Sequence, residues 1–266
     1  WRIPASQRQP RASGLGRVLS DPLLAGYPLE NVTVLSDGDA TRDNLRRALE
    51  RLKTSTADNS TVLVYFDCAA AEVSQGPDAG YYLCPFDYDP SDRRGSAITC
   101  TRGFGPAAGG ELIEHIESMP ASKVLLVLNT CSPDSMDPDV PVGSPFFREK
   151  FFQRIRQIPG RCIFSSCRMD EPTYTGIFAL LFFNALSGVR DESSDVDNQF
   201  YAQIAADTNA VFTFNLMDFL RRHMHHVMPK EYKDDVRMHP FLELGQEDNF
   251  VIARRTHPAH VMQMRT

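Results

Sequence analysis

The sequence lacks features that would assign a chain of 266 residues to several simple classes. No apolar run approaches the roughly 18 residues that a membrane-spanning helix needs, so we expect no membrane partner. Basic residues are not in excess, because 28 Lys and Arg stand against 34 Asp and Glu, for a formal net charge of −6. A chain without surplus positive charge is poorly suited to phosphate backbones, which argues against a nucleic-acid partner.

Cysteine is also scarce. Six cysteines in 266 residues are too few for the disulfide framework of a small secreted domain. No two of them have the Cys-x-x-Cys spacing of a structural zinc site. We therefore expect a cytoplasmic protein whose thiols are reduced.

The composition itself, with 42% hydrophobic and 23% charged residues, is that of an ordinary globular protein. Apolar runs typical of buried strands alternate with segments of helical periodicity, which predicts an α/β sandwich with a mainly parallel central sheet flanked by helices. Strands are expected at 31–35, 61–66, 81–84, 123–128, 161–165 and 249–253. Helices are expected at 40–53, 110–118, 146–157, 175–186 and 215–227.

We expect one domain over residues 1–266, in which a loop at 132–145 separates a first region, 1–145, from a second, 146–266. Both regions should share one sheet, because neither has enough strands alone. Polar residues follow three of the expected strands, at 67–70, 129–132 and 166–168. Ligands of such sheets bind beyond the carboxyl ends of the strands.

Cys131 directly follows the expected strand at 123–128 and its polar continuation. A nucleophile would be presented at this position, although a cysteine there can equally be a small buried apolar residue.

Several blocks of the sequence, in their order and spacing, resemble the caspase-like cysteine peptidases of clan CD (peptidase C14). The metacaspase and orthocaspase branch is the most similar. The blocks are residues 26–37, 40–45, 62–66, 80–87, 96–99, 123–131, 165–171, 176–178 and 248–253. The resemblance implies a three-layer caspase-like sandwich, with regions 1–145 and 146–266 similar to the large and small catalytic subunits.

Both catalytic motifs of that family are altered in this chain. Where the family has Ser-Gly-His-Gly with its catalytic His, the sequence reads Asp67-Cys68-Ala69-Ala70, so that Ala69 takes the place of the His. Cys131 keeps the position of the nucleophile. The family's Asp two residues earlier, which helps to hold a basic P1 side chain, is replaced by Asn129. The resemblance assigns substrate contacts to Asp67, Cys68, Asn129 and Asp170.

The loss of the His has a chemical consequence. A thiol attacks an amide as thiolate, and an adjacent imidazolium both lowers its pKa and protonates the leaving amine. Ala69 does neither, so we expect amide hydrolysis to fall by about 10⁴-fold or more. None of the seven histidines follows the strand that ends at Phe66, and His257 or His260 in the tail is the remaining alternative base.

The sequence therefore favours a pseudo-peptidase that binds or regulates, with a protein or peptide ligand as its partner, an active homologue included. The alternative is a cysteine endopeptidase of basic P1 preference that is active, or that carries an engineered change at position 69. A third interpretation is a structural domain of a longer polypeptide.

Three other groups are weaker candidates. His223 and His226 lie on one face of a helix and suggest a metal pair, although a solvated helix surface is the simpler interpretation. The acidic stretch 191–198 suggests calcium because many metacaspases are calcium-activated, but it lacks EF-hand spacing, and no cofactor is otherwise expected. Cys68 and Cys131 are a candidate disulfide or redox pair, which a reducing compartment disfavours.

The resemblance also implies a strand that this chain does not supply. The family has a further apolar strand, central in its sheet, ahead of the segment equivalent to Trp1, and nothing in residues 1–30 is similar to it. The chain begins with Trp1 rather than Met and shows no signal peptide. We expect that the strand lies upstream of this fragment, or that another element, such as a partner chain, fills its place.

Overall fold

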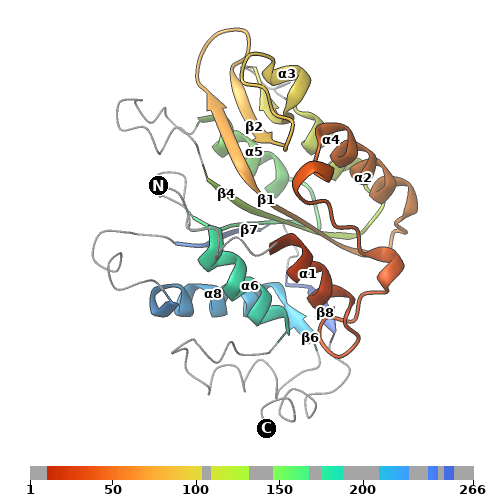
Figure 1. Cartoon of the computed structure of the whole chain (residues 1–266). Helices are drawn as coiled ribbons and strands as arrows, with labels where there is room; N and C mark the ends of the chain where they lie inside the picture. The colour runs from red at the N-terminus through yellow and green to blue at the C-terminus, as the bar shows by residue number, and fades with distance from the viewer. Residues whose placement is uncertain are drawn as a thin grey trace.

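The structure is a computed structural model that describes residues 11–103, 109–131, 146–167, 175–187, 210–227, 239–244 and 249–254. In this part of the chain a six-stranded sheet lies between two layers of helices (Figure 1). Its strands occur in the order β3-β2-β1-β4-β5-β7. Their bounds are β1 Thr61–Val73, β2 Gly80–Cys84, β3 Ile98–Arg102, β4 Lys123–Cys131, β5 Arg161–Ser165 and β7 Phe241–Leu244.

The centre of this sheet is parallel and its flanks are antiparallel. β1 pairs with β4 and β4 with β5 in parallel, whereas the β1–β2, β2–β3 and β5–β7 pairs are antiparallel. The expected α/β sandwich is confirmed, but its sheet is mixed rather than mainly parallel. The hairpin between β1 and β2 explains part of the difference, because a parallel crossover needs a connection of about a dozen residues or more and residues 74–79 are too few.

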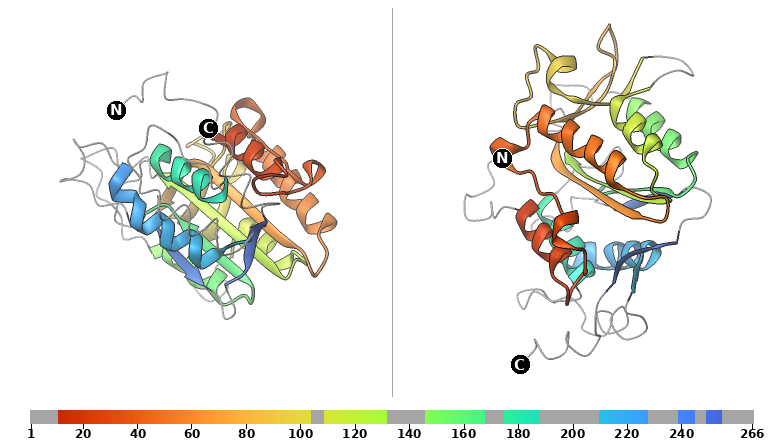
Figure 2. Two further views of the ribbon diagram at one scale, coloured as in Figure 1. Left: turned by 90° about the horizontal axis from the view of Figure 1, so that it is seen from below. Right: turned by 90° about the vertical axis from the view of Figure 1, so that its right-hand side faces the viewer.

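The helices form two layers, one on each face of the sheet (Figure 2). One layer consists of α1 Arg11–Ser20, α6 Thr175–Ser187 and α8 Thr213–Val227. The other consists of α2 Arg42–Ser55, α4 Glu111–Ser118 and α5 Phe146–Arg156. The short helix α3, Arg93–Ser96, lies between β2 and β3. A second sheet pairs β6 Ala210–Phe212 with β8 Val251–Arg254, so the strand expected at 249–253 lies outside the central sheet.

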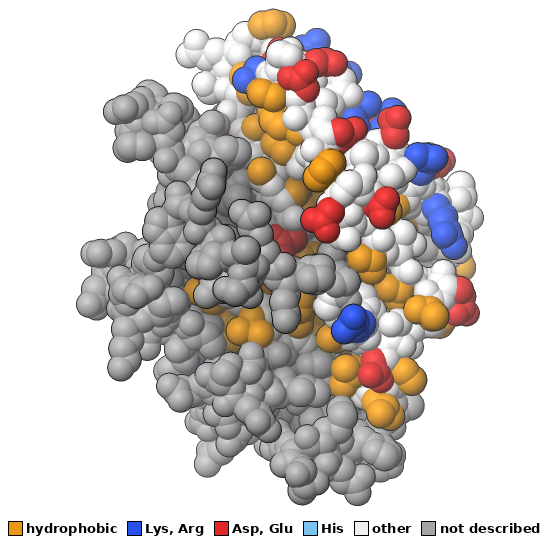
Figure 3. Space-filling view, in the orientation of Figure 1, with side chains coloured by type: hydrophobic (Ala, Val, Ile, Leu, Met, Phe, Trp, Pro, Cys, Tyr) orange, Lys and Arg blue, Asp and Glu red, His pale blue; other side chains and the backbone are white. Residues whose placement is uncertain are grey.

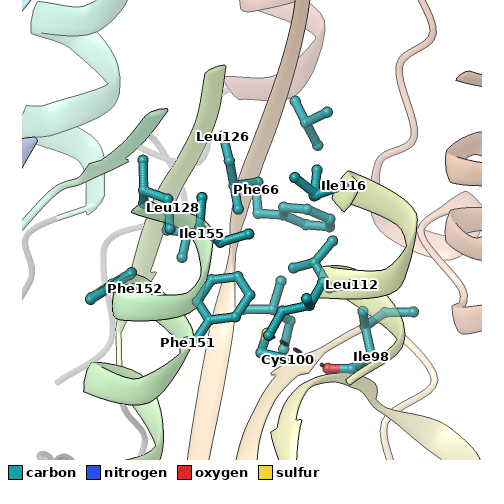
Figure 4. Packing of buried hydrophobic residues seen from close by; sticks show 14 of the residues in the cluster. Phe66, Ile98, Cys100, Leu112, Ile116, Leu126, Leu128, Phe151, Phe152 and Ile155 are labelled. Carbon is teal, nitrogen blue, oxygen red and sulfur yellow. Dashed lines mark hydrogen bonds between the residues drawn. The ribbon is translucent and has the colours of Figure 1, made fainter. Parts of the chain in front are cut away.

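Strand β4 shows why two cores form. Alternate side chains of a strand point to opposite faces, and Leu125 and Val127 accordingly pack toward α6 and α8. Leu126 and Leu128 pack on the other side among residues of α4 and α5 (Figure 4). All four are completely buried. A strand covered on both faces needs a continuous apolar run, which is what the sequence has here.

Two sequence expectations about strands are wrong. Residues 31–35 form no strand, because Leu29–Asn31 is a turn of 3-10 helix and the segment that follows joins no ladder. Val34 is 40% exposed, so the apolar residues that suggested a strand here are not all buried in a core. β1, by contrast, does not end near Phe66 but continues to Val73, because residues 69–73 pair with β2.

The surface charges, the helix lengths and the first described residues each bear on an expectation from the sequence. On the face that Figure 3 shows, the described acidic and basic side chains are interspersed, without a continuous basic patch. The strongly apolar helix α6 has 13 residues, and none of the helices in the described ranges combines the length and apolar character needed to cross a membrane. Residues 11–30, for their part, contribute α1 and no strand to either sheet.

Two glycines with positive φ predict a difference in stability. Gly160, at the turn into β5, has φ +70°, and a Cβ there would lie 2.0 Å from the carbonyl oxygen of Ser122. Gly76, between β1 and β2, has φ +84° with open space around it. We expect Gly76→Ala to lower the free energy of unfolding by about 1–2 kcal/mol, the cost of a left-handed Ala. Gly160→Ala should lower it by about 3 kcal/mol or more, because backbone must also move.

Denaturant unfolding of the wild-type chain and both variants measures this difference. Gly76→Ala serves as the control for the conformational cost alone. Equal losses in the two variants would contradict the close approach of Gly160 to Ser122.

Candidate functional site

The ladder between β1 and β4 brings the two altered motifs side by side. In its register Asp67 is the partner of Asn129, and Ala69 is the partner of Cys131. Neighbouring strands lie about 4.8 Å apart, so the backbones of Ala69 and Cys131 are direct neighbours. From the sequence, residues 67–70 were expected to follow a strand, whereas they lie within β1. Pairing with β4 holds Asp67, Cys68 and Ala69 in extended conformation, and pairing with β2 holds Ala69 and Ala70.

Asn129 is held inside the protein on the α6 side of the sheet. It is completely buried, and its Nδ2 donates a hydrogen bond of 3.2 Å to the hydroxyl of Tyr65. The ring of Tyr65 lies against Phe182 and Phe183 of α6, with ring centroids 5.4 and 6.1 Å apart. The amide of Asn129 is therefore part of the packing between β4, β1 and α6 rather than an exposed polar group.

The residues of the 67–70 motif are divided between the two faces of β1. Cys68 packs against the core on the α4 and α5 side and is only partly buried. Asp67 and Ala69, one position before and after it, point to the opposite face by the alternation of a strand. Cys68 takes part in no disulfide, so the bond considered between Cys68 and Cys131 is not formed.

A buried polar group outside the sequence motifs lies on the α5 side of the sheet, near the carboxyl ends of β4 and β5. At its centre is Arg148, whose Nη2 donates to the hydroxyl of Ser165 at 2.9 Å and to the carbonyl of Cys167 at 3.4 Å. Its guanidinium carbon lies 5.5 Å from the centroid of the Phe152 ring. The sequence contains a signal for the burial of Arg148. Positions 148, 152 and 155 form one helical stripe, so a charge at 148 falls on the apolar face of α5.

Glu72 and Tyr81 complete this group. The Oε1 of Glu72 accepts the backbone N–H of Phe147 at 2.8 Å, which ties the extended end of β1 to the first turn of α5. Burial raises the pKa of Glu72, although backbone hydrogen bonds from Phe147 and Arg148 and the charge of Arg148 oppose it. Tyr81 shares a hydrogen bond of 3.4 Å with Thr130, and burial raises its pKa well above the ordinary value. The phenol of Tyr81 is therefore neutral at physiological pH.

The described histidines lie apart from the Ala69–Cys131 pair. The Nδ1 of His115 on α4 is 3.7 Å from Glu50 on α2. His223 on α8 is only 4% exposed and its ring packs on Phe219 at 4.6 Å, so the solvated surface expected at this position is wrong. His239 is two residues before the start of β7, whose first residue pairs with the last residue of β5. It therefore lies at the same carboxyl edge of the sheet as Cys131, two strands away from β4.

Several sequence candidates lie outside the described residues. They are Asp170, the acidic stretch 191–198, the side chain of His226, His257, His260 and the side chain of Cys131. Among the residues that the structure does describe, no group of three or more His, Cys, Asp or Glu side chains is arranged to hold a metal ion.

Comparison with known proteins gives no assignment. No protein-family model matches the sequence, and no curated protein matches it either. The resemblance to caspase-like peptidases therefore remains a prediction from the motifs.

The raised pKa of Glu72 predicts how stability depends on pH. The folded chain binds the proton of Glu72 more tightly than the unfolded chain, so this residue stabilises the fold fully below about pH 4. Its contribution declines as pH rises toward the pKa of the folded state. The glutamine of a Glu72→Gln variant cannot ionise. We therefore expect the free energy of unfolding of the wild-type chain, relative to Glu72→Gln, to fall as the pH rises above about 4 and through the raised pKa of the folded state.

Urea unfolding of both proteins at a series of pH values measures this difference. A difference that instead grows with pH would mean that the hydrogen bonds and the charge of Arg148 outweigh the burial of the carboxyl group.

Proposed function

We propose that this chain is a caspase-like pseudo-peptidase, similar to metacaspases and orthocaspases, that keeps the cysteine of the nucleophile but lacks the base. Its role is to bind or regulate a protein or peptide, an active homologue included. The observation that carries the proposal is the register of the β1–β4 ladder. Ala69 is the direct neighbour of Cys131, and a methyl group can neither deprotonate a thiol nor protonate a leaving amine.

The arrangement of the strands supports the proposal. The sheet is enclosed by helices on both faces, and the two motifs come from adjacent parallel strands. A histidine at position 69 would stand next to the cysteine across the ladder, at a spacing of about 4.8 Å between strands. The pairing of the strands therefore supports position 69 as the place of the missing base.

His239 favours the alternative, an active cysteine endopeptidase, because it lies at the same edge of the sheet. Two strand spacings are about 10 Å, however, and a base has to approach within about 3 Å of the proton that it takes. His239 would have to move across β5 to act on Cys131. For this reason the pseudo-peptidase is the better supported function.

A hydrolysis assay tests the proposal directly. We expect the wild-type chain to cleave peptides that end in Arg, Lys or Asp before a reporter amine no faster than Cys131→Ala does. Cleavage that is abolished in Cys131→Ala would overturn the proposal. If His239→Ala then removed the activity as well, His239 would be the base of an active enzyme.

Restoring a histidine gives a second test. We expect Ala69→His to raise the rate at which iodoacetamide alkylates Cys131 at pH 7 several-fold to about tenfold, because a neighbouring imidazolium lowers the pKa of a thiol. Ala69→Gln is the matched control, since it adds a side chain of similar size without charge. Mass spectrometry of the modified peptide identifies the site. Equal rates in the two variants would contradict the pairing of positions 69 and 131.

A further inference from the structure

The turn at Asp37 and Gly38 combines two features that are rare in this chain. Among the described residues, Asp37 is the only one other than glycine with a positive φ, at 49°. The sequence contains no second Asp-Gly pair and no Asn-Gly pair. The turn is the short 3-10 helix Asp37–Asp39, and both residues of the pair are exposed. Because the left-handed region is unfavourable for a residue with a Cβ, the backbone of Asp37 is strained.

A carboxyl group and the neighbouring amide N–H are both unengaged at this turn. The carboxylate of Asp37 accepts no hydrogen bond and forms no ion pair within the described part of the chain. The N–H of Gly38 makes no hydrogen bond there either, since the bonds of the turn run from Asp39 to the carbonyl of Ser36 and from Ala40 to that of Asp37. A Cβ on Gly38 would meet nothing within 4 Å. The nitrogen of Gly38 is therefore unbonded and uncrowded.

Other aspartates of the described chain differ in this respect. The carboxylates of Asp21, Asp87, Asp89 and Asp92 each accept a hydrogen bond from a backbone N–H, at 2.8 to 3.0 Å. These bonds fix the torsions of the four side chains. Two of the four, Asp21 and Asp89, also precede proline, which has no N–H. In contrast to these four, the carboxyl group of Asp37 is free to turn toward the next amide.

We propose that Asp37 is a site of spontaneous isomerisation to isoaspartate. The nitrogen of Gly38 attacks Cγ of the Asp37 carboxylic acid, an N–Cγ bond forms, and the hydroxyl leaves with the amide proton as water. Because the reacting groups are neighbours on the chain, this step is intramolecular and needs no catalyst. Water then adds to the main-chain carbonyl of the cyclic imide, and the bond from that carbon to the nitrogen breaks. The chain now runs through Cβ and Cγ, whereas opening at Cγ regenerates aspartate.

The structure gives the reaction a driving force and a local effect. Isoaspartate adds a methylene to the backbone, which removes the constraint of a strained left-handed residue. The main-chain carbonyl of Asp37, which accepts the N–H of Ala40 at 2.9 Å, leaves the backbone and becomes a carboxylate. Ala40 in turn accepts the N–H of Phe86 at 3.0 Å, just after β2. Isomerisation therefore alters the turn before α2 and its contact with the residues after β2.

The modified turn has a partner of defined chemistry. Its new carboxylate is the group that protein L-isoaspartyl methyltransferases methylate, so the isomerised chain becomes a substrate of such a repair enzyme. The net charge and the mass of the chain do not change. The inference uses neither Ala69 nor Cys131, and it is independent of the proposed function.

Ageing of the intact chain at neutral pH and physiological temperature tests the proposal. We expect isoaspartate to accumulate at residue 37 several-fold faster than at Asp21, Asp87 or Asp92. Transfer of labelled methyl groups from S-adenosylmethionine by an L-isoaspartyl methyltransferase measures the total, and electron-transfer fragmentation of the peptides locates the residue. Accumulation elsewhere but not at residue 37 would overturn the proposal. So would a folded chain that forms no isoaspartate at residue 37 while the chain unfolded in urea does.

Two variants control for the chemistry. The open space around Gly38 accommodates the methyl group of Gly38→Ala, but a Cβ beside the nitrogen hinders its attack on Cγ. We expect methyl incorporation at residue 37 to fall several-fold, with an unchanged circular dichroism spectrum. Asp37→Glu keeps the charge but requires a larger ring, and it should form no isomer at this position. If either variant is labelled at residue 37 as fast as the wild-type chain, attack by the Gly38 nitrogen is refuted.

The effect on the neighbouring loop has its own measurement. We expect NMR of the aged chain to show a second set of amide resonances for Ala40 and Phe86, whose intensity grows with the isoaspartate content. The amide resonances of Leu125 and Leu126 in β4 are the internal control and should stay single. A single resonance for Phe86 in a chain rich in isoaspartate would contradict the expected change in its contact with Ala40.

Discussion

The parallel ladder between β1 and β4 is the contact on which the rest of the structure depends. It is the longest strand pairing in the described chain, and it runs in continuous register from Thr61 and Lys123 to Ala69 and Cys131. Because β4 is apolar on both faces, helices must cover it from both sides, and this requirement creates the two cores. The same register fixes which residues of the two altered motifs are neighbours. The architecture and the candidate site thus follow from one pairing.

The buried polar side chains around that ladder differ in how they are paired within the protein. Arg161 and Asn129 are each bound to partners within the protein, and both serve to hold elements together. Glu72 ties the far end of β1 to the first turn of α5, which begins the second half of the chain. Arg148 differs from these, because its charge has no paired carboxylate among the described residues.

The sequence pattern predicted the structure best for strands that are buried on both faces of the sheet. The runs at 61–66, 123–128 and 161–165 became β1, β4 and β5, and the helices at 40–53 and 110–118 formed close to their expected bounds. The prediction of a strand at 31–35 was wrong because alternating apolar residues are a local signal. A strand forms only if another strand has a free edge to pair with it. For the same reason the extension of β1 to Val73 could not be seen, since it depends on the hairpin with β2. The burial of Arg148 was visible in the sequence only as a charge on an apolar helical stripe.

By itself, the sequence established an α/β protein, because apolar periodicity is a local property of the chain, and its resemblance to caspase-like peptidases singled out Ala69, Cys131 and Asn129 as the positions of interest. Which of these residues become neighbours is a matter of strand register, and register is set by contacts between segments about 60 residues apart. The burial of Asn129 beneath Tyr65 and the partly used guanidinium of Arg148 arise in the same way. They depend on how helices close over the sheet, which no single segment encodes.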